Sequence, residues 1–545
     1  MKSSLTETSD GQVSRKSKDT RDWEQKMASP EFYVDKVSAV PGETVRLFAS
    51  SPSPQCSLEI RRIGHQSLLV ERIDNIQVAS HATPENADQF GCDWPVALEF
   101  KIGQDWKTGY YDLCLIAGDG TSSHHFVCVR KSRNEHKANA IIVLSTNTYV
   151  AYNYWGGANA YANVADLMAG RLDSAASREG AIARLSRMRP YAQTLICPPD
   201  VRLRLVNPTV RKMNELVTPA DPALIVEHGL SPYDGAAGFI RKWEHKFVSW
   251  MEEHGYELDY LTDQDFETEK GLLADYKTAF LVGHSEYWSK NARVQFDRFT
   301  EEGGNLAVFS GNTCYWKVRW EDDGQSMVAH KCRGEEQDPY WWDPKTLPDA
   351  THVWSHPEFG LPEAKMTGLS FLYGGYHRLC MCVARGGGAY TVYDDQHWAL
   401  DGTDLFYGDM IGGDLPLIGY ENDGCIINFD TQGLPVGSGV GVPENLEIIA
   451  IAPATLAESE RNPFPPLIPR EETDVLSTIA YGRNDDETVE RMMRGHAVMA
   501  SFKRGEGEVF NAGTTEWVYG LEAADPFVEE ITRNILRRFE VEPVE

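Results

Sequence analysis

The stretch Thr278–Ser310, TAFLVGHSEYWSKNARVQFDRFTEEGGNLAVFS, decides the fold class of this chain. It begins and ends with short apolar runs, 278–283 and 305–310, whose length is typical of buried strands. Between the two runs, Ser289 can cap a helix that ends at the glycine pair 303–304. The apolar face of that helix consists of Ala292, Phe296 and Phe299. A strand, a helix and a strand in this order predict a βαβ unit and therefore a parallel sheet.

The same alternation of strands and helices extends from this stretch to both sides. The run AIIVL at 140–144 predicts another buried strand, and a helix over 239–251 with an apolar face should end at Gly255. We therefore predict an open α/β domain of flavodoxin-like or glutamine-amidotransferase-like type, whose first part spans residues 138–337. Residues 338–545 are rich in Gly, Trp and Tyr and predict a strand-rich extension that returns to the α/β domain.

The final part of the chain carries the clearest signals of that return. The run GEVFNAG at 507–513 predicts a strand, and Asp525-Pro526 is a typical helix start. Apolar residues then recur every four positions, which indicates a packed terminal helix. They are Phe527, Ile531, Ile535 and Phe539.

The region before the α/β domain follows a different pattern. Residues 28–133 contain seven or eight short β-prone runs that are separated by turn residues, which predicts an immunoglobulin-like β-sandwich. Residues 1–27 are polar and lack the apolar core of a secretory signal, so we expect a disordered tail and a cytoplasmic protein. The predicted fold class is thus an all-β sandwich followed by an α/β domain.

Charge and composition exclude several classes of function. The 545 residues include 52 Lys and Arg against 81 Asp and Glu, a net charge of -29 that repels phosphate backbones and anionic lipids. We therefore expect no nucleic-acid partner. No window approaches 18 consecutive apolar residues, so we expect no membrane span either. The ten cysteines are scattered, which predicts neither a disulfide framework nor a paired zinc site.

Candidate chemistry follows the predicted strands, because ligands of open α/β sheets bind beyond the carboxyl ends of the strands. His284 and Glu286 lie two residues apart, so both side chains point the same way in an extended segment. Together they could serve as a metal ligand with a proton carrier, as a general acid and base, or as a structural hydrogen-bonded pair. Asn312 could donate its amide to a developing oxyanion, or it could be a turn residue.

Several long segments are similar to one known family, and they occur in that family's order. They are TYVAYNYWGG at 148–157, RPYAQ at 189–193, GHSEYWS at 283–289, GGNLAVFSGNTCYW at 303–316 and GEVFNAGTTEWVYGL at 507–521. On these segments the chain from about residue 138 to residue 545 resembles the large subunit of N,N-dimethylformamidase and its relatives. The resemblance implies a hydrolase of small N-substituted amides that uses one Fe(III) ion held by two tyrosinates and a glutamate.

The resemblance also implies particular site residues. The metal ligands fall on Tyr152, Tyr191 and Glu286, although Tyr149 lies in the same segment as Tyr152 and could replace it. The catalytic side chains fall on His284, Asn312 and Lys331. His284 would move protons, and the other two would stabilise the oxyanion while the ferric ion acts as a Lewis acid.

The same resemblance bears on partners. The family member works with a small helical subunit, and this chain begins instead with a predicted sandwich. We therefore expect a homo-oligomer, with a small helical subunit as the other possibility, and a small amide as the substrate.

Two other functions fit parts of the sequence. Cys314 follows a predicted strand and could be the nucleophile of a glutamine-amidotransferase-like amidase, activated by His284 and oriented by Glu286, or it could be a buried structural thiol. The chain could also be a non-catalytic carbohydrate- or protein-binding protein that uses its Trp and Tyr side chains for stacking.

Overall fold

The structure is a computed structural model, and it covers a defined part of the chain. It describes residues 29–133, 135, 137–169, 178–197, 236–240, 242–377, 388–413, 415, 417–456, 468 and 470–544. The predicted tail, residues 1–27, lies outside the described residues.

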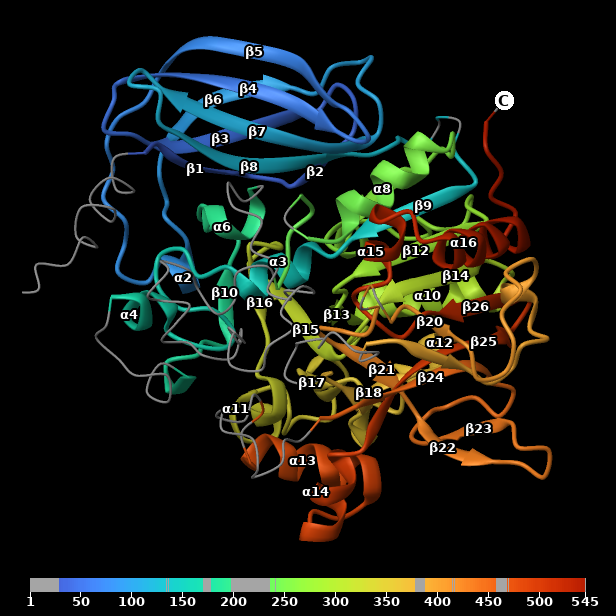
Figure 1. Cartoon of the computed structure of the whole chain (residues 1–545). Coiled ribbons are helices and arrows are strands. Elements are labelled where there is room, and N and C mark those ends of the chain that lie inside the picture. The colour runs from blue at the N-terminus through green and yellow to red at the C-terminus, as the bar shows by residue number, and fades with distance from the viewer. Residues whose placement is uncertain are drawn as a thin grey trace, which may run out of the picture.

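The N-terminal region forms two sheets that lie together at one end of the molecule (Figure 1). One sheet has the order β1-β3-β6, and its strands are β1 (Glu31–Val34), β3 (Thr44–Ser50) and β6 (Val96–Lys101). The other has the order β2-β8-β7-β4-β5, with β2 (Ser38–Ala39), β4 (Gln55–Ile63), β5 (Ser67–Gln77), β7 (Gly109–Ala117) and β8 (Ser122–Val129). Buried and partly buried positions alternate along much of β4, as expected for a strand with one face on a core. The strand-rich character of this region is confirmed, and its immunoglobulin-like topology stays a prediction.

A nine-stranded sheet organises the rest of the chain, with the order β11-β9-β12-β14-β26-β25-β24-β19-β20. Its strands are β9 (Ala140–Leu144), β11 (Asp259–Thr262), β12 (Thr278–Gly283), β14 (Asn305–Ser310), β19 (Tyr390–Val392), β20 (Met410–Ile411), β24 (Glu447–Ala454), β25 (Gly495–Arg504) and β26 (Gly507–Asn511). The first five strands in this order, β11, β9, β12, β14 and β26, are parallel to one another. The remaining strands, β25, β24, β19 and β20, each pair antiparallel with their neighbours. The predicted parallel strands at 140–144, 278–283, 305–310 and 507–513 are therefore all present.

Helices cover both faces of this sheet because its strands bury side chains on both sides. The longer ones are α8 (Glu244–Glu253), α10 (Lys290–Glu301) and α16 (Pro526–Arg538). Phe247 of α8 packs on Phe280 and Phe309 of one face, and Phe296 of α10 belongs to the core on the other face. The chain is thus a mixed α/β protein rich in strands, and the flavodoxin-like name stays a prediction.

The predicted helix boundaries are partly right. Ser289 caps α10 by accepting a hydrogen bond from the Ala292 backbone N–H, and the Asp525 side chain caps α16. The helix predicted over 239–251 begins only at Glu244, so Phe239 and Trp243 precede it. These two aromatic residues are buried all the same, and their burial imitates the apolar face of a longer helix.

Smaller elements surround the central sheet. A mixed sheet contains β10 (Arg184–Ser186), β13 (Tyr287–Ser289), β15 (Trp316–Glu321), β16 (Ser326–Val328) and β17 (His352–Val353). Two strand pairs are β18 (Ser370–Gly375) with β21 (Asn422–Gly424) and β22 (Ile426–Phe429) with β23 (Pro435–Ser438). Short helices are α2 (Ala87–Phe90), α3 (Thr146–Tyr152), α4 (Val164–Met168), α6 (Gln193–Ile196), α9 (Asp265–Thr268), α11 (Gly334–Gln337), α12 (Ala364–Thr367) and α15 (Val518–Glu522). The 3-10 turns are η2 (Lys331–Arg333), η3 (Leu347–Asp349), η4 (Pro357–Phe359) and η5 (Trp398–Leu400).

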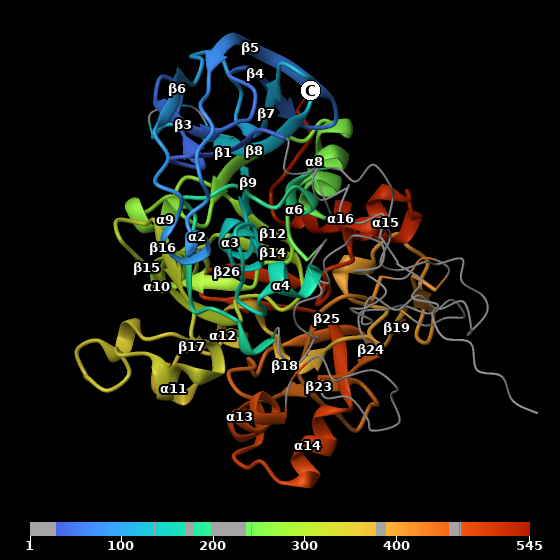
Figure 2. The same cartoon turned by 90° about the vertical axis from the view of Figure 1, so that its left-hand side faces the viewer.

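Two further helices, α13 (Arg470–Tyr481) and α14 (Asp486–Met492), lie at the opposite end of the molecule from the N-terminal sheets (Figure 2). The described helices include none with the length and apolar character needed to cross a membrane.

Candidate functional site

The candidate site lies where β12 and β14 end side by side. The two strands are parallel neighbours, and Gly283 and Ser310 occupy paired positions. The segments that follow them, beginning with His284 and Gly311, therefore start at the same edge of the sheet. Gly283 adopts a φ of +77°, and a side chain there would meet Trp243 Cβ at 2.5 Å. The backbone can thus turn sharply into the His284–Glu286 segment because residue 283 has no side chain.

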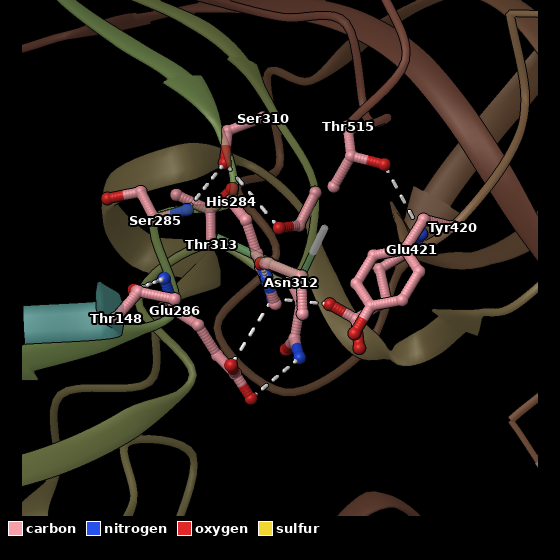
Figure 3. Close-up of polar contacts among 12 residues, drawn as sticks. Thr148, His284, Ser285, Glu286, Ser310, Asn312, Thr313, Tyr420, Glu421 and Thr515 are labelled. Carbon is pink, nitrogen blue, oxygen red and sulfur yellow. Dashed lines mark hydrogen bonds and ion pairs between the residues drawn. The ribbon is translucent and has the colours of Figure 1, made fainter. Parts of the chain in front are cut away.

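His284 lies between two buried carboxylates (Figure 3). Its Nε2 is 3.2 Å from Glu286 Oε2 and 2.5 Å from Glu421 Oε2, and its Nδ1 is 2.8 Å from the Ala236 carbonyl oxygen. Both ring nitrogens therefore face acceptors. Burial lowers the pKa of His284, but the two carboxylates outweigh burial and raise it to about 9.

Glu286 is held by three donors at a single oxygen. Its Oε1 accepts hydrogen bonds from Trp316 Nε1 at 2.7 Å, Tyr161 Oη at 2.8 Å and Asn312 Nδ2 at 3.2 Å. The residue is 2% exposed, and this burial raises the pKa of its carboxyl group while His284 opposes the rise. Asn312 adopts a left-handed backbone with a φ of +53°, which suits an asparagine in a turn.

A group of phenols extends from Glu286. Tyr161 Oη also accepts a hydrogen bond from Tyr287 Oη at 2.7 Å and one from Tyr152 Oη at 3.0 Å. Tyr152 Oη in turn lies 3.5 Å from Tyr420 Oη. Burial, followed by the charge of Glu286, raises the pKa of Tyr152 and Tyr161 well above the usual value.

The ammonium group of Lys331 lies over the ring of Tyr161 and is the last member of the group. Its Nζ lies 3.0 Å from the centre of that ring, and 5.3 Å from the centre of the Trp316 ring. Burial lowers the pKa of Lys331 to about 8, and the charge of Glu286 opposes this effect. Five of the six predicted site residues are therefore brought together: Tyr152, His284, Glu286, Asn312 and Lys331.

Tyr191 lies apart from the other two predicted ligands, Tyr152 and Glu286. Its ring packs against His125 and Phe126 of β8, with ring centroids 5.1 and 5.7 Å apart. Its hydroxyl group is buried and has no hydrogen-bond partner among the described residues. Tyr149, the alternative to Tyr152, donates to Glu244 Oε1 at 2.6 Å. The contacts described above thus connect Tyr152 to Glu286 through Tyr161, and Tyr191 as a ligand stays a prediction.

Sequence reasoning missed five members of this group: Tyr161, Tyr287, Trp316, Tyr420 and Glu421. Tyr287 and Trp316 lie inside the segments that carried the resemblance, so their position was available as a signal. Tyr161 follows the Tyr-rich segment after two glycines, and its role appears only when the chain folds back on Glu286. Glu421 had no local signal, because its segment reaches His284 from a distant part of the chain.

Cys314 is buried away from the group around Glu286. It belongs to the apolar core on the α10 side of the sheet, and its Sγ lies 3.8 Å from Arg293 Nη1. Burial raises the pKa of this thiol, and Arg293 only partly opposes the rise. A thiol in such surroundings is a weak nucleophile, which favours the structural interpretation of Cys314.

The donor atoms at the site suit a hard cation through oxygen. In the part of the chain that the structure describes, no three His, Cys, Asp or Glu residues are placed to hold a metal ion. Tyr152 Oη, Tyr161 Oη and Glu286 Oε1 are linked by contacts of 3.0 and 2.8 Å. Neighbouring ligands in an octahedral oxygen site with bonds of about 2.0 Å lie about 2.8 Å apart. Two of the three oxygen–oxygen distances thus match this spacing, which is also the length of ordinary hydrogen bonds.

One family model matches most of the chain. The family model described as "N,N-dimethylformamidase beta subunit-like, C-terminal" matches residues 57–531. The chain belongs to this family. The match spans the central sheet and every residue of the group around Glu286, and it also includes much of the N-terminal sheets.

Comparisons with individual proteins add little. No curated protein matches the chain. A cycloisomaltooligosaccharide glucanotransferase from Paenibacillus sp., in complex with cycloisomaltoheptaose, is 13% identical over 22% of this chain and 17% of its own length, with a TM-score of 0.14. The sulfur carrier protein SoxY from Chlorobium limicola f thiosulfatophilum is 17% identical over 18% of this chain and 76% of its own, with a TM-score of 0.11. Similarity at this level carries no conclusion about fold or function.

Proposed function

We propose that this protein hydrolyses the C–N bond of a small N-alkyl or N-aryl amide to a carboxylic acid and an amine, with one Fe(III) ion as cofactor. The family description supports a dimethylformamidase-like amide hydrolase in general terms. The observation that carries the proposal is the line of buried oxygens from Tyr152 through Tyr161 to Glu286.

The proposed ligands are those three oxygens. Two phenolates and one carboxylate supply three negative charges, which match a trivalent cation. Tyr161 takes the place that the sequence resemblance assigned to Tyr191, because Tyr161 contacts both Tyr152 and Glu286. A ferric ion bound there would supply Lewis acidity toward the amide carbonyl group.

His284 is the proposed proton carrier. The pKa of His284, raised to about 9, keeps the ring mostly protonated at neutral pH. In the neutral form Nδ1–H donates a hydrogen bond to the Ala236 carbonyl, and Nε2 is the base that can take a proton from the attacking water. The same nitrogen can then return the proton to the departing amine. Glu421, 2.5 Å from Nε2, stabilises the intermediate imidazolium and fixes the ring in this orientation.

Two further side chains would stabilise charge. Asn312 orients Glu286 through its amide, and Lys331 adds a buried cation beside Tyr161 and Glu286. Aromatic rings around His284, including Trp243 and Tyr420, would favour the apolar substituents of an N-alkyl or N-aryl amide.

The proposed assembly is a homo-oligomer, or alternatively a complex with a small helical subunit. Light scattering gives the mass of the assembly for the chain purified alone and for the chain purified from its natural source. A multiple of the chain mass in both samples indicates a homo-oligomer, and additional mass only in the second indicates a further subunit.

Metal analysis and a visible spectrum test the proposed function together. Iron at about one per chain, a tyrosinate-to-iron absorption band and hydrolysis of a small N-substituted amide are the expected results. Full hydrolysis by protein that contains no iron would contradict the metal part, and iron-loaded protein that releases no amine from a panel of such amides would contradict the reaction.

A further inference from the structure

A second group of reactive side chains lies in the N-terminal sheets, away from the site around Glu286. Asp112 and Cys114 are two residues apart on β7, so both side chains point to the same face of the sheet. His124 of β8 occupies the position directly paired with Cys114. A carboxylate, an imidazole and a thiol are thereby placed side by side on one face of the five-stranded sheet.

The distances within this group follow the order thiol, imidazole, carboxylate. His124 Nε2 lies 3.7 Å from Cys114 Sγ, and His124 Nδ1 lies 3.0 Å from both carboxylate oxygens of Asp112. An imidazole that is oriented by a carboxylate and faces a thiol is the arrangement that activates cysteine nucleophiles. Each ring nitrogen of His124 has one of these two partners.

The backbone of His124 is fixed from the neighbouring helix. Gln193 of α6 accepts a hydrogen bond from the His124 backbone N–H at 2.6 Å and donates one to the His124 carbonyl oxygen at 3.1 Å. Because β8 is held at this position, the imidazole keeps its place between the thiol and the carboxylate. Figure 1 shows α6 close to β8.

Reagents in solvent can reach the thiol. Cys114 is partly exposed and the His124 side chain is 26% exposed, whereas the Asp112 side chain is 9% exposed. The carboxylate is therefore the most buried of the three groups, whereas the imidazole and the cysteine are both partly exposed. By comparison, five other described cysteines are buried: Cys56, Cys92, Cys128, Cys314 and Cys425.

The charges around the group leave the imidazole as the closest cation to the sulfur. On β4, Glu59 is paired with Cys114 and Arg61 with Asp112. The carboxylate of Glu59 forms ion pairs with Arg61 at 2.8 Å and with Arg72 of β5 at 2.5 Å, so two positive charges balance its negative charge. Burial lowers the pKa of His124, but the hydrogen bond to Asp112 outweighs it and raises the pKa to about 10. An imidazolium beside a thiol favours the thiolate.

We propose that Cys114, His124 and Asp112 form a reactive-thiol site that exchanges with low-molecular-weight disulfides. In this step the Cys114 thiolate attacks one sulfur of a small disulfide, a bond forms between these two sulfurs, and the original disulfide bond breaks. The departing thiolate takes up a proton from solvent, while Asp112 keeps the His124 ring charged. The product is a mixed disulfide on Cys114, which a second small thiol reverses.

The pH dependence of alkylation in the full-length protein tests this site. The protein is treated with iodoacetamide between pH 6 and pH 8, and mass spectrometry follows the Cys114 and Cys332 peptides in the same sample. An ordinary thiol reacts about tenfold faster for each pH unit in this range, because its thiolate fraction rises with pH. We expect the Cys114 rate to rise by clearly less than tenfold per pH unit, and at pH 6 to exceed the rate of the same thiol in the His124→Gln variant about tenfold.

Variants separate the imidazole from simple exposure. His124→Gln should make the Cys114 rate at pH 6 fall about tenfold and should restore the ordinary rise with pH, while Cys332 is unchanged. Asp112→Asn should have the same effect in a smaller degree. Treatment of the wild-type protein with oxidised glutathione should then yield a mixed disulfide on Cys114 in preference to Cys332.

The pH dependence of Cys114 alkylation in the wild-type protein tests the proposal even if the variants fold poorly. A Cys114 rate that rises about tenfold per pH unit from pH 6, as for an unassisted thiol, would overturn the proposal. So would equal formation of the mixed disulfide on Cys114 and Cys332. Amide hydrolysis plays no part in these readouts, so their outcome is independent of the proposed function.

Discussion

His284 and Glu421 are joined by a contact of 2.5 Å between Nε2 and Oε2, although they come from distant parts of the chain. His284 follows the parallel strand β12, and Glu421 immediately precedes β21. Because Nδ1 of the same ring faces the Ala236 carbonyl oxygen, the ring is held from both sides. The histidine with the proposed role in proton transfer is therefore contacted by a carboxylate from a distant segment as well as by Glu286 of its own segment.

Glu421→Gln should slow turnover without removing the metal. The amide keeps the shape of the side chain but cannot stabilise the imidazolium, so kcat should fall roughly 10- to 100-fold with little change in KM. Steady-state kinetics with iron analysis on the same samples measure both effects. Glu421→Asp should recover part of the activity, whereas loss of iron in Glu421→Gln would show that Glu421 is a metal ligand instead.

Glu286→Ala should abolish both iron content and turnover. This carboxylate is the only one in the proposed ligand set, and three donors converge on its Oε1. Metal analysis and an amide-hydrolysis assay provide the two readouts. Glu363→Gln is the matched control, because Glu363 is equally buried but binds Ser355 and Ser370 instead. Retention of iron in Glu286→Ala would contradict the proposed ligand set.

Tyr161→Phe and Tyr191→Phe distinguish two assignments of the second phenolate. Tyr161 contacts both Tyr152 and Glu286, so its loss should lower the iron content and weaken the tyrosinate absorption band. Tyr191→Phe should leave both unchanged, because the described contacts of its ring are with His125 and Phe126. The opposite pattern would restore Tyr191 as the ligand that the sequence resemblance indicated.

Cys314→Ala should retain the turnover of the wild-type protein. Its thiol is buried beside Arg293, and burial raises its pKa, so it has neither the exposure nor the thiolate character of a nucleophile. The kcat for amide hydrolysis is the decisive measurement, and a thermal melt monitors the loss of packing. A fall of kcat to background in a folded variant would favour the cysteine-nucleophile mechanism.

Asp112→Asn should lower thermal stability more at pH 6 than at pH 10. The pKa of His124 is raised to about 10 in the folded protein, from about 6.5 when unfolded. The ion pair with Asp112 thus contributes fully below about pH 6.5, and its contribution is lost as the pH rises through about 10. Melting temperatures of the wild-type and variant proteins at both pH values test this. Asp119→Asn, in the turn before β8, is the control and should show no such difference.

Much of the architecture could be read from local sequence. The apolar runs at 140–144, 278–283 and 305–310 became parallel strands, and Ser289 and Asp525 cap the helices that they were expected to cap. These features depend on short-range physics, namely apolar runs of strand length and side chains that bond to nearby backbone N–H groups. The helix start at Glu244 was misplaced because buried aromatic residues outside a helix give the same pattern.

The candidate site, like the fold, could be predicted from the sequence only in part. The two-residue spacing already placed His284 and Glu286 on one side of an extended segment, and Asn312 was found from its position after a predicted strand. The family resemblance added Tyr152 and Lys331. Tyr161 and Glu421 emerged only from the fold, because a hydrogen bond between distant segments leaves no periodic trace in either one. The sequence alone determined several parallel strands of the sheet, among them 140–144, 278–283 and 305–310, and the side chains that follow them. Tertiary structure decided which of those side chains meet, because that depends on how loops from separate parts of the chain converge at the sheet edge.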